Sequence, residues 1–215
     1  MTSTKPFSFD TIEDFDDHIA KSIPNYHLLS SAIASLATFF VRPDTRIVDL
    51  GCSTGKLLES IQFNGEKVGI DISENLLPES KENITFIKKD LRAFDNFGQA
   101  SFISSVFTLQ FLPIEDRLGV LKAVYDSLIT GGAFVWAEKV YEHDGQFERL
   151  LTSAHYDFKR QKFTAEEILD KEFDLRSIMT TNTSHENRFL AEEAGFESGT
   201  QFWKFYNFEA WVFIK

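Results

Sequence analysis

Cysteine, proline and long apolar runs are all scarce in this chain. Its 215 residues include one cysteine, Cys52, and five prolines. A single cysteine excludes an internal disulfide and any zinc site built from several cysteines, and we expect no metal. No apolar run approaches the ~20 residues of a membrane-spanning helix, and Met1–Pro6 lacks the apolar core of a signal peptide. We therefore expect a cytoplasmic protein without a membrane partner.

Basic residues are too few for a nucleic-acid surface. Lys and Arg number 22 against 33 Asp and Glu, which gives a net charge of −11. Binding to a phosphate backbone requires clustered Lys and Arg. The local basic runs, Lys88–Lys89 and Lys159–Lys162, are short, and we interpret each as a solvated face. We expect no direct binding to nucleic acid.

Strand and helix patterns alternate through the middle of the sequence. The predicted strands lie near 46–50, 67–71, 84–88, 102–107 and 133–137. The predicted helices lie near 55–63 and 114–128, with a short helix or turn near 74–79. Gly131–Gly132 is expected to end the helix at 114–128. This alternation predicts right-handed βαβ units and an α/β fold with a mainly parallel sheet.

Helical segments are predicted both before the sheet and within it. Residues 1–42 are expected to form an N-terminal helical cap, with helices near 7–21 and 25–41. Residues 140–180 interrupt the alternation and carry apolar residues at helical spacing, as in Phe147, Leu150 and Leu151. We expect them to be a helical insertion that covers the site.

The end of the chain predicts a different strand arrangement. A helix at 185–194 is expected to end at Gly195. Two strands follow, near 198–206 and 209–214, and only Asn207 and Phe208 separate them. So short a connection predicts an antiparallel hairpin at the edge of the sheet.

The segment from Ile47 to Gly55 is the most informative part of the chain. Two apolar residues lead into Asp49, and a turn with glycine at 51 and 55 follows. Glycine lets a backbone approach a ligand closely, and turns of this kind bind ligands in parallel α/β sheets. Asp71 comes 20 residues after Gly51, at the end of the next strand. A carboxylate there can accept hydrogen bonds from two ribose hydroxyls.

Two kinds of nucleoside site can be distinguished here. A dinucleotide fold prefers G-x-G-x-x-G, which admits a pyrophosphate at a helix N-terminus. This chain instead has Asp49, Gly51, Ser53 and Gly55 at alternate positions. The acid at the strand end repels a pyrophosphate and suits a ligand that has an ammonium group and no phosphate. S-adenosylmethionine is such a ligand, and the pattern resembles motif I of class I methyltransferases. The resemblance implies their Rossmann-like sheet, with S-adenosylmethionine as the cofactor.

More polar residues follow the later strands. Asp90 and Leu91 come after the third predicted strand and offer a carboxylate and a backbone N–H to an adenine edge. Val106 ends the fourth strand, and Glu138 follows the fifth. Because the carboxyl ends of parallel strands meet at one edge of a sheet, we expect these residues to gather there.

Longer strings make the resemblance more specific. They are Ser22–Tyr26, Phe107–Leu112, Gly131–Ala133, Glu138–Lys139, His155–Arg160 and Tyr206–Phe208. From about residue 7 to the C-terminus the chain resembles the carboxy-S-adenosylmethionine synthase family, which acts in tRNA wobble-uridine modification, and its close methyltransferase relatives. The resemblance implies that Tyr26 closes over the cofactor from the N-terminal segment. It also implies these cofactor contacts: Gly51, Cys52, Ser53, Asp71, Ile72, Asp90 and Leu91. We expect Asp49, Gly55 and Val106 to contact the cofactor as well.

Two positions depart from the synthase pattern. Val106 stands where the synthase has an asparagine, just before Phe107. The synthase also pairs an arginine of the late helix with the added carboxylate, and counting back from Gly195 places Leu190 there. Arg188 lies roughly 200° away around a helix. A carboxylated cofactor buried without a cationic partner would be unfavourable by roughly several kcal/mol. These departures favour ordinary S-adenosylmethionine chemistry over carboxyl transfer.

The candidate catalytic residues are His155, Tyr156, Glu138 and Tyr206. Methyl transfer mainly requires alignment and exclusion of water, and it needs a base only when the acceptor is protonated. His155 and Tyr156 lie in the insertion, although a surface histidine is the simpler interpretation. Glu138 can instead pair with a nearby cation, and Tyr206 can belong to an edge strand. Cys52 has no evident histidine partner, so we interpret it as a packing residue.

Our leading hypothesis is one S-adenosylmethionine-binding domain over residues 1–215 that methylates a small molecule. The alternatives are a carboxy-S-adenosylmethionine synthase that uses prephenate, an enzyme that rearranges or cyclises the cofactor itself, and a non-catalytic cofactor sensor. The phenylalanine-rich surface of the insertion would suit a homodimer.

Overall fold

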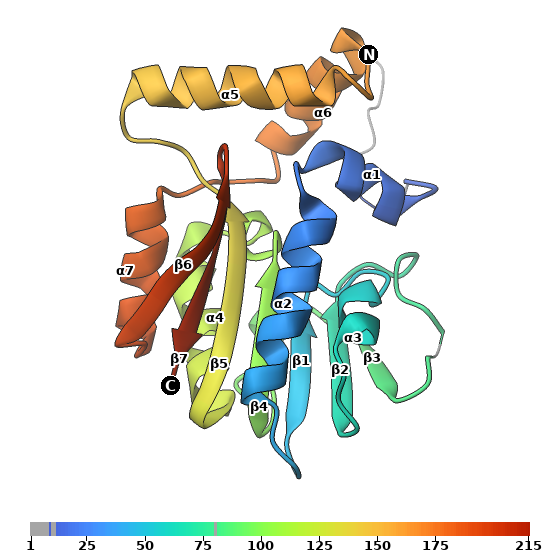
Figure 1. Cartoon of the computed structure of the whole chain (residues 1–215), viewed down its shortest axis with the longest axis vertical. Coiled ribbons are helices and arrows are strands. Elements are labelled where there is room, and N and C mark those ends of the chain that lie inside the picture. The colour runs from blue at the N-terminus through green and yellow to red at the C-terminus, as the bar shows by residue number, and fades with distance from the viewer. Residues whose placement is uncertain (1–8, 10–11, 80) are drawn as a thin grey trace.

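The computed structural model describes residue 9, residues 12–79 and residues 81–215, which form a seven-stranded sheet in the order β3-β2-β1-β4-β5-β7-β6 (Figure 1). The strands are β1 (Arg46–Leu50), β2 (Glu66–Asp71), β3 (Ile84–Lys88), β4 (Ala100–Val106), β5 (Leu128–Lys139), β6 (Ser198–Phe205) and β7 (Phe208–Ile214). The first five pair in parallel, and β7 runs antiparallel to both β5 and β6. The mainly parallel sheet with an antiparallel C-terminal hairpin is therefore confirmed.

Helices cover both faces of the sheet. One face carries α2 (Tyr26–Phe40) and α3 (Lys56–Ser60), and the other carries α4 (Ile114–Ser127) and α7 (Ser184–Ala194) (Figure 1). Alternation along β1 supplies both cores. Ile47 packs on the side of α2, whereas Val48 and Leu50 pack on the side of α4. Burial on both faces explains why the buried residues of the strand, Ile47–Leu50, are all apolar apart from Asp49.

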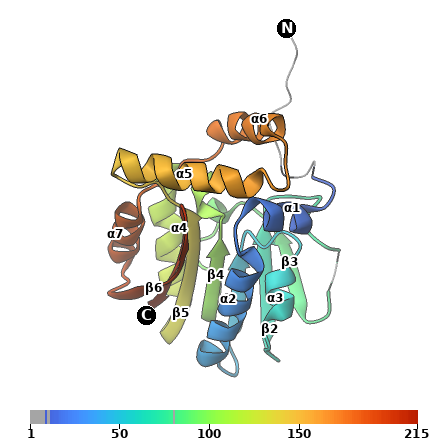
Figure 2. The same cartoon turned by 45° about the horizontal axis from the view of Figure 1, so that its top comes forward.

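Three helices lie across the carboxyl ends of the strands. They are α1 (Phe15–Ser22), α5 (Gly145–Lys159) and α6 (Ala165–Arg176), and Figure 2 shows α5 and α6 above the sheet. The side chain of Asp144 accepts hydrogen bonds from the first backbone N–H groups of α5, and Thr164 and Glu167 form a capping box on α6. These caps explain why the segment after β5 folds as two separate helices.

Two boundaries differ from the sequence-based expectation. The helix predicted at 114–128 ends at Ser127, and Gly131–Gly132 lies inside β5 instead of capping the helix. Gly131 donates to the carbonyl of Lys215 at 2.7 Å, and Lys215 donates to the carbonyl of Gly132 at 3.0 Å. Gly131 has φ +77, and the pairing of β4 with β5 shifts register nearby, so the glycines form a strand irregularity.

The helix predicted at 7–21 is helical from Phe15 onward and not at residues 12–14, and its residues 7, 8, 10 and 11 lie outside the described part of the chain. Within the described residues α1 starts at Phe15, where Asp14 caps it by accepting from the backbone of Asp17 at 3.0 Å. The segment near 74–79 is a turn, and Gly195 ends α7 in the left-handed conformation, as expected. None of the helices in the described part of the chain combines the length and apolarity needed to cross a membrane.

Candidate active site

A cavity of about 570 Å³ lies at the carboxyl edge of the sheet. Its volume is typical of a small-ligand site. The walls come from the segments that follow β1 to β5 and from α1, α5 and α6. The structure brings these predicted site residues to its lining: Tyr26, Asp49, Gly51, Cys52, Ser53, Asp71, Ile72, Asp90, Leu91, Val106 and His155.

The turn after β1 is held against β2. The backbone N–H groups of Gly51 and Cys52 both donate to the carbonyl of Ile70, at 2.7 and 3.1 Å. Gly51 has φ +77, and a Cβ there would lie 2.1 Å from Oγ1 of Thr108. Only glycine therefore fits, both for its backbone conformation and for the close approach of the loop after β4. The backbone of this turn is therefore exposed in the wall of the cavity.

Asp71 connects this turn to the next strand. Its Oδ2 accepts from the backbone N–H of Ser53 at 2.9 Å, and its Oδ1 accepts from that of Ser73 at 2.8 Å. These bonds orient the carboxylate at the end of β2, where it lines the cavity. Gly55 is outside the lining; it begins α3 with φ +74, and a Cβ there would lie 2.7 Å from the ring of Phe86. Its role in the structure is the turn geometry.

Asp49 is buried beneath the same turn. The hydroxyl of Ser104 donates to its Oδ1 at 2.7 Å. Burial raises the pKa of Asp49 to about 7, despite this hydrogen bond, because a charged carboxylate is poorly solvated there. Burial also raises the pKa of the Cys52 thiol, so this side chain is neutral and packs tightly against Gly69. The packing interpretation of Cys52 agrees with its position.

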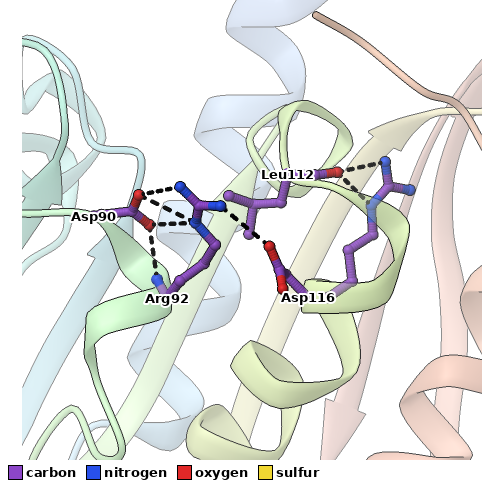
Figure 3. A network of polar contacts seen from close by, with 5 residues as sticks. Asp90, Arg92, Leu112 and Asp116 are labelled. Carbon is purple, nitrogen blue, oxygen red and sulfur yellow. Dashed lines mark hydrogen bonds and ion pairs between the residues drawn. The ribbon is translucent and has the colours of Figure 1, made fainter.

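Asp90 is held by a partner that the sequence did not reveal. It caps the short helix η2 (Leu91–Ala93), and the guanidinium of Arg92 donates to its carboxylate at 2.6 to 3.1 Å (Figure 3). Arg92 also bonds Asp116, at 3.2 Å. The hydrogen bonds from Arg92 keep the pKa of Asp90 low. The carboxylate is therefore ionised and fixed in place, with Leu91 beside it in the cavity wall.

The loop after β4 is fixed by Glu138, which lies beneath the cavity and outside its lining. Oε2 of Glu138 accepts from the backbone of Gln110 at 3.0 Å, and Oε1 accepts from the indole of Trp136 at 2.8 Å. Gln110 in turn accepts from the backbone of Lys139 at 2.9 Å. Burial raises the pKa of Glu138 to about 8. The structure thus gives Glu138 a supporting contact, and it does not bring this candidate base to the cavity.

The guanidinium of Arg117 holds the same loop from the side of α4. It donates to the carbonyl oxygens of Gln110 and Leu112, and to that of Thr180 at 2.6 Å. Phe107 lines the cavity with φ +56, a conformation that is rare outside glycine. A clamped loop can maintain such strain next to a site.

His155 is the only one of the four candidate catalytic residues in the described lining. Its Nε2 donates to the carbonyl of Ser22 at 2.9 Å, which ties α5 to the end of α1. Burial lowers the pKa of His155 to about 4, so the imidazole is neutral. The surface interpretation of this histidine is therefore wrong, because its ring packs edge-on against Phe208 at 4.9 Å.

Tyr156 and Tyr206 lie away from the cavity. Tyr156 follows His155 on α5 but is not part of the lining. Tyr206 occupies the turn between β6 and β7 and lines a separate cavity of about 300 Å³, together with Asn25 and Phe158. Tyr156 is excluded because α5 presents only one face to the cavity, whereas Tyr206 belongs to a turn that lies beside the separate cavity.

Position 190, where the synthase has its arginine, is also remote from the cavity. Leu190 packs against the core beneath α4 and α7, and no residue of α7 is among the described lining. Arg188 lies on the surface, where its Nε donates to Glu192 at 3.0 Å. The cations that do line the far end of the cavity were missed by the sequence analysis. Lys159, interpreted there as part of a solvated face, is only 5% exposed.

This strand order, with a glycine turn after β1 and a carboxylate after β2, defines the class I methyltransferase fold. A methyltransferase domain model matches residues 47–132. The carboxy-S-adenosyl-L-methionine synthase of Staphylococcus epidermidis is 33% identical over 95% of this chain and 94% of its own. That of Shewanella denitrificans is 33% identical over 94% and 88%. Human N-acetylserotonin methyltransferase in complex with SAM has a TM-score of 0.61 at 16% identity, covering 88% of this chain and 52% of that one.

The chain belongs to the carboxy-S-adenosyl-L-methionine synthase family. It is an S-adenosylmethionine-dependent transferase, with S-adenosylmethionine as its cofactor or substrate.

Proposed function

We propose that this chain transfers a methyl group from S-adenosylmethionine to a small molecule bound in the same cavity. The observation that carries the proposal is the continuity of that cavity, which runs from the turn at Gly51 and the carboxylate of Asp71 to α5 and α6. A volume of about 570 Å³ is in the range of sites that enclose drug-sized ligands. One cavity can therefore hold the cofactor and the acceptor side by side.

The residues of the turn fit the cofactor by their chemistry. Asp71 offers oriented carboxylate oxygens to a ribose, and the Gly51 turn offers a backbone surface that a Cβ would fill. Asp49, at the floor, suits a ligand with an ammonium group, and Asp90 with Leu91 suits an adenine edge. When bound, S-adenosylmethionine supplies an already activated methyl group, so the chain mainly has to align the acceptor and exclude water.

Calorimetry with S-adenosylmethionine tests the cofactor site. We expect saturable binding by the wild type and clearly weaker binding by Asp71→Ala. Equal affinities for the two proteins would contradict the assignment. Incubation with a small-molecule extract, followed by mass spectrometry, tests the transfer. Appearance of S-adenosylhomocysteine with a methylated product is expected, and an unchanged cofactor would favour a sensor instead.

Synthesis of carboxy-S-adenosylmethionine from prephenate is the second candidate. The names of the relatives and the strings Phe107–Leu112 and His155–Arg160 support it. From the sequence alone, the leucine at position 190 is evidence against carboxyl transfer. That evidence is weaker in the structure, because position 190 does not line the cavity of this chain. Mass spectrometry of cofactor incubated with prephenate separates the two reactions, since only this candidate adds the mass of CO₂ to the cofactor.

Rearrangement or cyclisation of the cofactor is a third reaction that the same cavity admits. Incubating the purified chain with S-adenosylmethionine alone tests it. We expect the cofactor to remain unchanged, because the proposed reaction needs a second substrate.

A further inference from the structure

The second cavity, of about 300 Å³, lies against a different face of α5 from the main one. His155 and Lys159 of that helix line the main cavity, whereas Asp157 and Phe158 line the second. The rest of its described lining comes from the N-terminus of α2, from the residue after α5 and its cap, and from the connection between β6 and β7. Three segments far apart in the sequence therefore build it, and the two cavities share no lining residue.

Three aromatic residues contribute to the wall of this second cavity. Phe158 comes from α5, and Phe205 and Tyr206 come from the end of β6 and the connection that follows it. The ring centroids of Phe205 and Tyr206 lie 4.6 Å apart, and the ring planes are inclined at 65°. The face of an aromatic ring carries a partial negative charge, so several rings around one small cavity favour a cation that is poorly hydrated.

The charge of the second cavity is negative. Asp157 is the one charged residue in its described lining. The guanidinium of Arg160 lies 3.9 Å from this carboxylate, and the two side chains are 67% and 77% exposed, so solvent screens the pair. The C-terminal end of α5 and the N-terminal end of α2, where Asn25 lies, carry dipole charges of opposite sign and about half a unit each. These partial charges offset one another, and the full charge of Asp157 decides the sign.

Two residues of this lining hold the left-handed backbone conformation. Asn25 has φ +57 and Tyr206 has φ +50. Asparagine adopts this conformation readily, whereas a bulky aromatic residue is rarely found in it. Strain of this kind persists where the surrounding structure maintains it, and such places are often binding sites. The ring of Tyr206 is therefore kept in the cavity wall at an energetic cost.

We propose that the second cavity, bounded by Asp157, Phe158 and Tyr206, binds an organic cation whose ammonium group carries methyl groups. A metal ion fits less well, because it needs several ligating side chains, and the described residues contain no group of three His, Cys, Asp or Glu that could hold one. A primary ammonium is compact and strongly hydrated, whereas a methylated one presents an apolar surface to the aromatic rings. This inference goes beyond the proposed function and does not depend on it.

Ligand-observed NMR with choline tests the proposal, and 3,3-dimethyl-1-butanol is the uncharged match of nearly the same shape. Both dissociation constants are measured with and without saturating S-adenosylmethionine. We expect choline to bind roughly 3- to 30-fold more tightly than the alcohol in both conditions. Equal affinities, or the lack of saturable choline binding, would overturn the proposal. Displacement of choline by S-adenosylmethionine would place choline in the main cavity and would overturn it too.

Variants locate the site. Tyr206→Leu removes a ring and should weaken choline binding by roughly 3- to 10-fold, whereas Tyr206→Phe keeps the ring and should retain the binding. Asp157→Asn should weaken it by roughly 2- to 5-fold, and by less at high salt, because solvent screens the carboxylate. Asp170→Asn is the matched control, since Asp170 is an exposed acid on α6 outside both described linings. Unaltered choline binding in either Tyr206→Leu or Asp157→Asn would refute the assignment.

Thermal unfolding and cofactor binding separate a local effect from a loss of the fold. We expect the S-adenosylmethionine affinity of Tyr206→Leu to stay within about twofold of the wild type, because the two cavities share no lining residue. If Tyr206→Leu lost cofactor binding as well, its effect would count as a loss of the fold. Asp157→Asn, which changes an exposed side chain, would then decide the proposal alone.

Discussion

The two ends of the cavity are built in opposite ways. At the end formed by the loops after β1 to β3, the carboxylates of Asp49, Asp71 and Asp90 each accept hydrogen bonds from the protein. At the end formed by β5, α5 and α6, the buried Lys159 lines the cavity. The first end is already organised without a ligand, whereas at the second end Glu172 acts on Lys159 electrostatically without forming an ion pair with it. Under the proposed function, the first end holds the cofactor and the second end holds the acceptor.

The largest expected effect is at the cofactor end. Asp71→Ala removes an ionised acceptor that also orders the turn through Ser53 and Ser73, and we expect S-adenosylmethionine affinity to fall roughly 10- to 150-fold. Asp71→Asn is the control, because it keeps one oxygen acceptor and should lose less. Calorimetry measures both. If Asp71→Ala weakened choline binding as strongly as cofactor binding, the two cavities would not be separate.

Asp49, which is buried beneath the turn after β1, should make the stability of the protein depend on pH. Burial raises the pKa of Asp49 to about 7, so between about pH 4 and pH 7 the folded chain holds a proton that the unfolded chain has released. The contribution of Asp49 to stability should therefore fall as the pH rises through this window, by up to about 1.4 kcal/mol per pH unit. Asp49→Asn should remove this contribution from the slope in urea unfolding. Glu138, whose pKa is raised to about 8, contributes with the same sign, and His155, whose pKa is lowered to about 4, contributes with the opposite sign.

Binding of S-adenosylmethionine should change the pH dependence that Asp49 causes. A ligand with an ammonium group stabilises the ionised form of Asp49, so saturating S-adenosylmethionine should reduce the slope in the wild type and not in Asp49→Asn. An equal reduction in both proteins would show that the ammonium group lies elsewhere.

A moderate effect is expected where α5 meets α1. His155→Phe removes the donor to the carbonyl of Ser22 and should lower the free energy of unfolding by about 1–3 kcal/mol. Because burial lowers the pKa of His155 to about 4, the contribution of His155 to stability should be lost as the pH falls from about 6.5 towards 4. The difference in stability between wild type and variant should therefore shrink over this range. NMR titration of the imidazole gives the pKa directly. Titration near the ordinary value would contradict the buried, neutral assignment.

The smallest effect is expected at Tyr206, which lines the separate cavity. Tyr206→Phe should leave S-adenosylmethionine affinity within about twofold of the wild type, because it touches neither end of the main cavity. Calorimetry on this variant provides the baseline for the others. A tenfold loss would require the two cavities to communicate.

Local patterns predicted the sheet well because burial on both faces leaves a strong apolar signal in each central strand. The strand at 46–50 was placed correctly, and the hairpin at the C-terminus followed from its two-residue connection. The same local reasoning misplaced Gly131–Gly132, since a glycine pair after a helix pattern is typical of a cap. Pairing with Lys215, 84 positions away, is what makes these glycines part of β5.

The site was predictable to the extent that it follows strand ends. Asp49, Gly51, Asp71 and Asp90 all line the cavity because parallel strands deliver their carboxyl ends to one edge. The catalytic candidates were less predictable. Glu138 follows a strand as the others do, but it points under the loop to hold Gln110. Nothing in the sequence distinguishes a carboxylate that supports a loop from one that faces a ligand.

The amino-acid sequence by itself determined the α/β architecture, the glycine turn and the carboxylates that follow successive strands. Each of these features depends on a local pattern of a few consecutive residues. Only the tertiary structure decided that Lys139, Lys159 and Lys171 meet at one end of the cavity. They come from β5, α5 and α6, and electrostatic repulsion among them exists only once those elements have packed together. Burial, which makes Lys159 informative, is a property of the folded chain.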